Sequence, residues 1–286
     1  ELIKLANLII SLTKCVACGN RVQALFDIKS SQEVTSDKDV IGNADYAVEF
    51  RGVSLKYKNA GEDSLTGMDF AVKRGETVGI IGGTGSGKSS LVNMIPRFYD
   101  ATAGEVLIGG RDVKSFEIPE LRERIGIVPQ KAVLFKGSIR DNMRWGKDDA
   151  TDDEILAAAK TAQAADVIES KGGLDFEIEQ GGKNLSGGQR QRFTIARALV
   201  RKPEILILDD SASALDFATD AALRRSICEM DTNPTVFIVS QRTSSIQHAD
   251  KIIVLDDGKI AGIGKHDELL NNLSLIHISE PTRPLY

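Results

Sequence analysis

Short apolar runs bounded by glycine, proline, asparagine or aspartate recur along most of the chain, and longer helical patterns lie between them. An apolar, β-branched-rich run of four to eight residues between turn residues is typical of a buried strand. This pattern predicts strands at Tyr46–Val53, Met68–Val72, Thr77–Ile81, Glu105–Ile108, Ile125–Val128, Ile205–Leu208, Thr235–Val239 and Lys251–Leu255. Because helical segments alternate with strands, we expect an α/β fold with a largely parallel sheet and helices on both faces.

The first residues carry a different pattern. Residues 1–29 are predicted to form a helix with an apolar stripe over Leu2–Ile28, and residues 30–45 a polar linker. The longest apolar run, Leu5–Leu12, is too short to span a bilayer by itself. An ordinary surface helix fits the same composition. Since the chain begins at Glu1 without methionine or a signal peptide, we expect it to be part of a longer product.

The last residues, 273–286, include the stretch LSLIHISEPTR, which resembles the translation of an adapter used to prepare DNA libraries. We expect this segment to be non-native and leave it out of the fold prediction.

Composition restricts the function classes. The net charge of −5 and the lack of a Lys/Arg block give no reason to expect a nucleic-acid partner. Three cysteines in 286 residues cannot form a disulfide framework, which favours a reducing cytosol. Cys15 and Cys18 have C-x-x-C spacing but lack two further zinc ligands nearby, and Cys228 is expected to be buried in a helix. Asp152-Asp153-Glu154 is an acidic cluster suited to the first turn of a helix.

A glycine-rich segment follows the predicted strand Thr77–Ile81, and a helix is predicted to begin at Leu91 after it. The segment reads Gly82-Gly83-Thr84-Gly85-Ser86-Gly87-Lys88-Ser89-Ser90, which has the spacing and the strand-to-helix context of a P-loop. Glycines let backbone N–H groups turn inward around phosphate oxygens. We therefore expect this segment to bind the phosphates of ATP, with Lys88 at the β- and γ-phosphates and Ser89 as a ligand of Mg²⁺.

The apolar run Ile205–Leu208 ends in Asp209. By itself such a run is usually a core strand. Paired with a P-loop, it indicates a Walker B strand whose terminal carboxylate binds Mg²⁺.

A third motif, Leu185-Ser186-Gly187-Gly188-Gln189, lies between the P-loop and Asp209. In this order the motifs resemble those of ABC transporters of the exporter type, which include multidrug and lipid exporters, and the resemblance extends over residues 46–272. It implies a P-loop NTPase fold with a RecA-like core, an antiparallel β subdomain at its start and a helical subdomain at about residues 131–200. In that family two nucleotide-binding domains face each other head to tail, so Ser186, Gly187, Gly188 and Gln189 would contact the ATP held by the partner's Walker motifs.

The resemblance also assigns roles to single residues. Tyr57 stands where the family has an aromatic ring stacked on adenine, and a solvent-facing strand tyrosine is the alternative. Gln130 matches the glutamine that touches Mg²⁺ and senses the membrane domain. Asp216 matches the end of the D-loop, which communicates across the dimer. Residues 1–29 resemble the cytoplasmic end of the last transmembrane helix of an exporter, an arrangement that importer ATPases lack.

Two positions depart from the family pattern. The catalytic glutamate after Walker B is Asp210 here, one methylene shorter, which retracts the carboxylate by about 1 Å, a misplacement that can cost about 10²-fold in rate. The switch histidine is Gln241, which can donate a hydrogen bond to the γ-phosphate but cannot become cationic. With both changes on the Walker side and an intact signature, the chain resembles the degenerate-site subunit of a heterodimeric exporter.

The sequence therefore predicts Mg²⁺-dependent ATP binding and hydrolysis coupled to export, with Asp210, Gln241 and Gln130 at a weakened site. The expected partners are a second half-transporter and the chain's own membrane domain, at the cell membrane with this domain on the cytoplasmic side. The alternatives are a homodimer with slow sites, an ATP-binding regulatory module and an importer ATPase.

Overall fold

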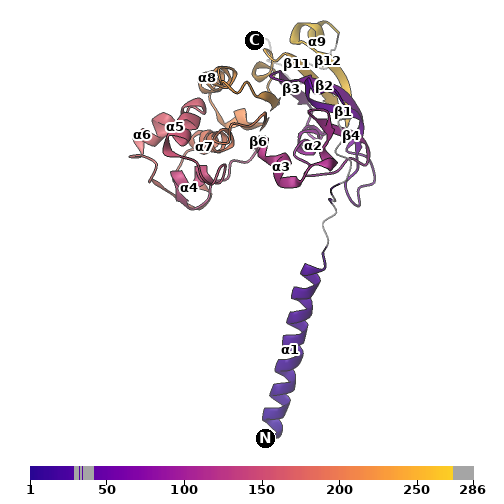
Figure 1. Cartoon of the computed structure of the whole chain (residues 1–286), viewed down its shortest axis with the longest axis vertical. Helices are drawn as coiled ribbons and strands as arrows, with labels where there is room; N and C mark the ends of the chain where they lie inside the picture. Colours follow the sequence, from indigo (N-terminus) through magenta and orange to yellow (C-terminus); the bar gives the residue numbers. More distant parts are fainter. Residues whose placement is uncertain (29–31, 33, 35–41, 273–286) are drawn as a thin grey trace, which may run out of the picture. The chain divides into compact units, whose positions relative to one another are not determined.

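The computed structural model describes residues 1–28, 32, 34 and 42–272 (Figure 1). The chain divides into two compact units, Glu1–Val34 and Thr35–Tyr286. Most of the predicted linker and the whole of residues 273–286 lie outside the described residues.

The first unit contains the helix α1, Leu2–Phe26, and every residue of this helix is exposed. Within the described part of the chain, α1 alone is long and apolar enough to cross a membrane, with a mean hydropathy of 1.6 in its most apolar window. The prediction considered only the run Leu5–Leu12 and so underestimated the apolar length of this helix, because small residues extend the apolar stretch beyond that run. Signal sequences and some core helices share this composition.

A six-stranded sheet forms the centre of the second unit, in the order β12-β11-β3-β10-β9-β6. The strands are β3 Thr77–Gly82, β6 Ile125–Val128, β9 Ile205–Asp209, β10 Thr235–Val239, β11 Lys251–Asp256 and β12 Lys259–Gly264. All pairs are parallel except β11–β12. Every residue of β9 and β10 is buried, as expected for strands covered on both faces. The edge strand β12 was not predicted, because its glycines and partly exposed isoleucines do not form a buried apolar run.

A second sheet is antiparallel, in the order β2-β1-β4-β5. Its strands are β1 Tyr46–Leu55, β2 Leu65–Lys73, β4 Ala103–Ile108 and β5 Arg111–Asp112. One hydrophobic cluster joins this sheet to the helix α2, Lys88–Met94, and to inward residues of the central sheet such as Ile80 and Ile207. The helix α2, which follows the P-loop, therefore packs with residues of both sheets.

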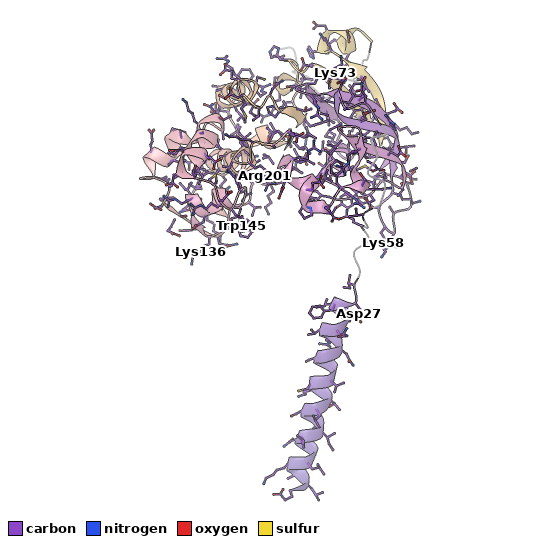
Figure 2. All side chains as sticks on the ribbon, in the orientation of Figure 1. Asp27, Lys58, Lys73, Lys136, Trp145 and Arg201 are labelled. Atoms are coloured by element: carbon purple, nitrogen blue, oxygen red, sulfur yellow. The ribbon has the colours of Figure 1, made fainter. Side chains whose placement is uncertain are left out.

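The helical region carries its own small hairpin. Its elements are β7 Gly137–Ser138, α4 Ile139–Arg144, α5 Asp152–Thr161, α6 Ala165–Ser170, β8 Glu177–Ile178 and α7 Gly187–Leu199. In Figure 1, α4 to α7 gather on one side of β6, and α2 and α3 (Ile118–Glu123) lie on the other. Arg201 lies where the two sides meet (Figure 2). Its guanidinium donates to the carbonyl oxygens of Gly146 (2.8 Å from Nε) and Arg122 (2.9 Å from Nη1), which ties the helical region to α3.

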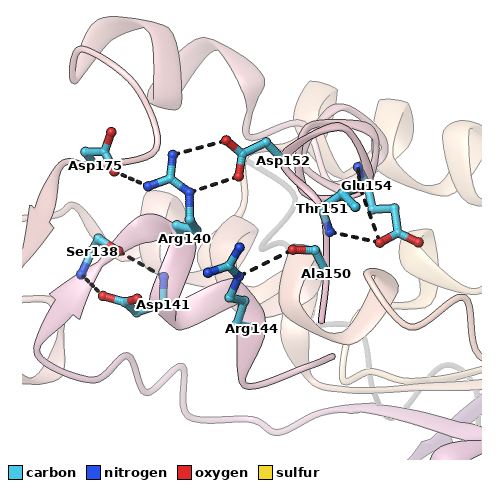
Figure 3. A network of polar contacts seen from close by, with 9 residues as sticks. All are labelled: Ser138, Arg140, Asp141, Arg144, Ala150, Thr151, Asp152, Glu154 and Asp175. Carbon is cyan, nitrogen blue, oxygen red and sulfur yellow. Dashed lines mark hydrogen bonds and ion pairs between the residues drawn. The ribbon is translucent and has the colours of Figure 1, made fainter. Parts of the chain in front are cut away.

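A polar network holds the helical region together (Figure 3). Arg140 donates to both carboxylate oxygens of Asp152, at 2.9 and 3.1 Å, and also to Asp175. Asp152 begins α5, and the Thr151 and Glu154 side chains form a capping box there. The acidic cluster predicted to begin a helix is therefore found at a capped helix start.

The remaining helices are α8 Phe217–Cys228 and α9 His266–Asn272, with the 3-10 helices η1 Val113–Ser115, η2 Gln180–Gly182, η3 Ser211–Ala214 and η4 Thr243–Ser245. The predicted α/β class, with an antiparallel sheet and a helical region beside a parallel core, is confirmed. The prediction that Cys228 is buried was wrong, because it is the last residue of α8 and is exposed there.

Candidate functional site

The glycine-rich loop after β3 wraps around the side chain of Lys88. Its Nζ donates to the carbonyl oxygens of Gly82 at 2.8 Å and Gly83 at 2.6 Å. Gly85 and Gly87 have φ of +85° and +95°, values that favour glycine, so the loop can turn sharply twice. The helix α2 begins at Lys88, three residues before the predicted start, because the loop leads directly into it. Burial lowers the pKa of Lys88, and the nearby charges of Asp209 and Asp210 oppose this shift.

The carboxylate that ends β9 lies against the same loop. The Ser89 hydroxyl donates to Asp209 Oδ1 at 3.2 Å, although the two residues are 120 positions apart. Asp209 is buried, and this burial, together with the charge of Asp210, raises the pKa of its carboxyl. Two oxygen donors of the kind that Mg²⁺ prefers are thus adjacent at the start of α2.

Gln130 and Asp210 meet beside this pair. The Gln130 Nε2 donates to Asp210 Oδ2 at 3.2 Å. They follow β6 and β9, which are parallel neighbours, so their carboxyl ends share one edge of the sheet. Asp210 has φ of +47°, and its N–H donates to the Val239 carbonyl oxygen at 2.9 Å.

The switch segment, residues 240–245, contains Gln241 and follows β10 at the same edge. The N–H of Ser240 donates to the Ile80 carbonyl oxygen at 3.1 Å, which binds the end of β10 to the P-loop strand. Gln241 is the next residue and is exposed. The sequence-predicted residues from β3, β6, β9 and β10 are therefore brought to one edge.

Tyr57 reaches the P-loop helix from the end of β1. Its hydroxyl lies 2.8 Å from Ser90 Oγ, and its ring meets Tyr99 edge-to-face with centroids 4.9 Å apart. Tyr57 is half-buried, so it is not a freely solvent-facing strand tyrosine. Tyr99 had no role in the sequence prediction.

The signature residues lie at the start of α7, in the helical region and away from α2 (Figure 1). The Ser186 hydroxyl accepts from the Gln189 N–H at 3.2 Å, and the Gln189 side chain accepts from the Ser186 N–H. Ser186 and Gly187 are exposed. A Cβ on Gly188 would lie 3.3 Å from the Ala214 carbonyl oxygen. The signature turn therefore packs closely on η3, which ends shortly before Asp216 in the sequence. Asp216 caps α8 by accepting from the Thr219 N–H at 2.9 Å.

A cleft beside the P-loop adds residues that the sequence reasoning missed. Gly85 and Gly87–Ser90 line one part of it, and Glu62–Ser64, Asp257 and Gly258 line the rest. The latter come from the β1–β2 loop and the β11–β12 turn. No local motif marks them, because only the strand pairing brings these turns to the loop.

The described residues contain no cluster of three or more His, Cys, Asp or Glu side chains that could hold a metal ion. A cation at this edge would therefore depend on Ser89, Asp209 and a bound anion together. The loop offers backbone N–H groups, a lysine and a hydroxyl around one cleft, which suits a polyphosphate bound with a divalent cation.

Known proteins are similar to this chain in sequence. YgaD of Bacillus subtilis (strain 168), whose name provisionally describes a multidrug export ATP-binding/permease protein, is 41% identical over 272 residues, covering 94% of this chain and 46% of YgaD. The uncharacterized ABC transporter ATP-binding protein YfiB of the same strain is 39% identical over 269 residues, again covering 94% of this chain and 46% of YfiB. The chain thus spans about half the length of these relatives.

A solved structure is similar over the same region. The structure of a bacterial Atm1-family ABC exporter with ATP bound matches with a TM-score of 0.87 and 34% identity, covering 94% of this chain and 47% of that one. The sequence model described as ABC transporter matches residues 65–213, just over half of the chain. These residues contain the P-loop, Gln130, the signature and Asp209. The chain belongs to the ABC transporter family.

Proposed function

We propose that this chain is the ATP-binding part of an exporter subunit, in which ATP binding and hydrolysis drive transport across a membrane. The observation that carries the proposal is the meeting of Ser89 with Asp209 and of Gln130 with Asp210 at one edge of the sheet. The names of similar proteins support export, since YgaD is described as an export protein and the solved neighbour as an exporter.

ATP would be held by the P-loop. Lys88 would leave the carbonyl oxygens of Gly82 and Gly83 and bind phosphate oxygens, which attract its charge more strongly. Ser89 and Asp209 would hold Mg²⁺, which when bound neutralises phosphate charge. The aromatic ring of Tyr57, whose hydroxyl contacts Ser90, would provide a surface beside the first turn of α2 on which a base could stack.

The same geometry favours slow hydrolysis at this chain's own site. Asp210 would orient the attacking water, but its carboxylate is one methylene shorter than that of glutamate and already bonds to Gln130. Gln241 would donate to the γ-phosphate without carrying a charge. We propose that this site holds ATP and turns it over slowly.

A second domain would complete each site. Ser186 and Gly187 are exposed at the start of α7, across β6 from the chain's own P-loop (Figure 1). The signature would therefore contact nucleotide on another subunit. Since only the Walker side departs from the family pattern, we propose a heterodimer in which this signature completes the partner's competent site.

Two features support a membrane partner. The helix α1 is long and apolar enough to belong to a membrane domain. Phe135, five residues after Gln130, contacts Trp145 with ring centroids 4.8 Å apart and ring planes tilted by 33°, and Trp145 is 66% exposed on the helical region (Figure 2). An exposed aromatic pair of this kind suits a protein contact. We propose that the membrane domain binds here, with this domain on the cytoplasmic side.

Nucleotide binding tests the first part of the proposal. Lys88→Ala should weaken the affinity for Mg-ATP by at least about tenfold, because one charge-assisted contact is lost. Lys160→Ala removes an exposed lysine on α5 and serves as the matched control. Equal affinities of the two variants, with unchanged melting temperatures, would contradict the proposed site.

Turnover tests the asymmetry. In the full-length transporter assembled with its partner, Asp210→Ala should reduce ATPase activity much less than removal of the partner's catalytic carboxylate, whereas Ser186→Ala should reduce it strongly. Brisk hydrolysis by this subunit when paired only with itself would instead refute the proposal that its own site is slow. An unchanged rate with Ser186→Ala would favour a regulatory ATP-binding module.

A further inference from the structure

A largely buried ion pair on α8 is hydrogen-bonded to the switch segment that follows β10. Asp220 and Arg224 lie one turn apart on α8, and Arg224 Nη2 donates to Asp220 Oδ2 at 2.7 Å. Arg224 Nη1 also donates to two backbone carbonyl oxygens of η4, Ser245 at 2.7 Å and Ser244 at 3.3 Å. The Arg224 guanidinium therefore contacts both a carboxylate on its own helix and η4, the C-terminal end of the switch segment.

Burial makes the contact between Arg224, Asp220 and η4 costly to break. The side chains of Asp220 and Arg224 are 10% and 20% exposed, and Ser245 is buried. Burial raises the pKa of Asp220, while the charge of Arg224 and a hydrogen bond from the Ser245 side chain oppose the shift. Buried carbonyl oxygens and carboxylates are costly to leave without donors, so the segment has little freedom to move away from Arg224. A planar guanidinium can serve a carboxylate and carbonyl oxygens at once, and a lysine cannot do so with the same geometry.

The other end of the segment is held as well. Ser240 is bonded to Ile80 on the P-loop strand, and its hydroxyl accepts from the Arg242 N–H at 2.9 Å. Gln241 lies between these two attachments and is exposed at the carboxyl edge of the sheet. Its position over the site therefore depends on both anchors, of which one is the P-loop strand and the other is α8.

We propose that Arg224 is a positioning residue that, supported by Asp220, sets the place of Gln241 at the γ-phosphate end of the nucleotide site. The inference rests on the proposed function, because it needs ATP bound at the P-loop. It adds a residue that touches no nucleotide and acts through η4. Because Asp216, at the end of the D-loop, caps the start of α8, the same pair also links the switch segment to the D-loop.

Discrimination between ATP and ADP measures this positioning. We would use the full 286-residue chain in detergent and compete a non-hydrolysable ATP analogue and ADP against a fluorescent nucleotide. Arg224→Met should lower the preference for the ATP analogue over ADP by roughly tenfold, the loss expected for one hydrogen bond to a charged group, with ADP affinity unchanged. Arg225→Met is the matched control, since Arg225 is the next residue of α8 and is exposed, and it should change the preference less than about twofold.

A second variant separates the loss of positioning from a loss of folding stability. Arg224→Met alone leaves the buried Asp220 carboxylate without its cation, whereas the double change Asp220→Met with Arg224→Met removes both charges and avoids that cost. The double variant should melt close to the wild type and still lose the preference. Adding Arg224→Met to Gln241→Ala should give no further loss, because both changes act on one contact.

The outcomes separate the two proposals. If the wild type does not bind the ATP analogue, or if Gln241→Ala leaves the preference unchanged, the proposed site itself is wrong. If Gln241→Ala lowers the preference and both Arg224 variants retain it, the site stands and the positioning role is refuted. Equal losses of ATP and ADP affinity in the Arg224 variants would also refute it, because they indicate a purely structural role.

Discussion

The close approach of Gly82 to the neighbouring strand offers a direct test of how the P-loop is held. A Cβ on Gly82 would lie 2.2 Å from the Leu255 carbonyl oxygen and 2.6 Å from Ser86 Oγ. Leu255 is the register partner of Gly82 in the parallel pair β11–β3. At Gly83, the next residue, a Cβ would meet no heavy atom within 4 Å in the described part of the chain. Gly82→Ala and Gly83→Ala therefore form a matched pair.

The expected cost follows from the obstacle. Ordinary contacts of a Cβ begin at 3.4 Å, so the strands must separate by more than about 1 Å to admit the methyl group of Gly82→Ala. A flexible side chain could rotate away, but a carbonyl oxygen within a sheet cannot. Overpacking costs about 1–3 kcal/mol, and we expect about 3 kcal/mol here. For a domain of this size, that loss lowers the melting temperature by about 6–12 °C. Gly83→Ala should stay within about 0.5 kcal/mol of the wild type.

Thermal unfolding followed by circular dichroism, in one detergent for all three proteins, measures the difference. Binding of a non-hydrolysable ATP analogue at a temperature where each protein is folded then reports on the loop itself. We expect Gly82→Ala to bind more weakly, because displacement of β3 from β11 moves the loop that follows. A melting temperature within about 2 °C of the wild type, together with normal binding, would refute the packing argument.

Three further predictions concern other parts of the molecule. In an assembled transporter whose partner lacks its catalytic carboxylate, Asp210→Glu should raise ATP turnover at this chain's own site by up to about 10²-fold, because it extends the carboxylate by about 1 Å, and an unchanged rate would show that the carboxylate position is not limiting. The hydrogen bond from Arg124 lowers the pKa of Glu204. Its ionised form therefore stabilises the fold above the ordinary glutamate pKa, and the advantage in melting temperature over Glu204→Gln should be full at neutral pH and vanish as the pH falls through the lowered pKa. Arg140→Met removes the bonds to Asp152, and it should speed amide exchange at the start of α5 while changing the melting temperature little, whereas unchanged exchange would show that the network does not hold that helix.

Much of the site could be predicted because its motifs are local. The P-loop contains its glycines, its lysine and its serine within nine consecutive residues, and the strand before it is a plain apolar run. Asp209 was paired with it because an apolar run that ends in aspartate, together with a P-loop, indicates a Walker B strand. The structure then gives the contact itself, Ser89 to Asp209, across 120 positions. Gln130 and Asp210, 80 positions apart, were placed by resemblance to the family, and their contact depends on β6 lying beside β9.

The fold class, the position of the phosphate-binding loop and the unusual residues Asp210 and Gln241 were determined by the sequence alone. Backbone periodicity and turn residues act over a few positions, so they can be recognised without tertiary contacts. The hydrogen bond from Arg224 to the Ser245 carbonyl oxygen, and the burial of the Asp220–Arg224 pair on α8, were decided only by the tertiary structure. Such contacts depend on which strands are neighbours and on how α8 packs against them, and the sequence of a short segment does not determine that packing.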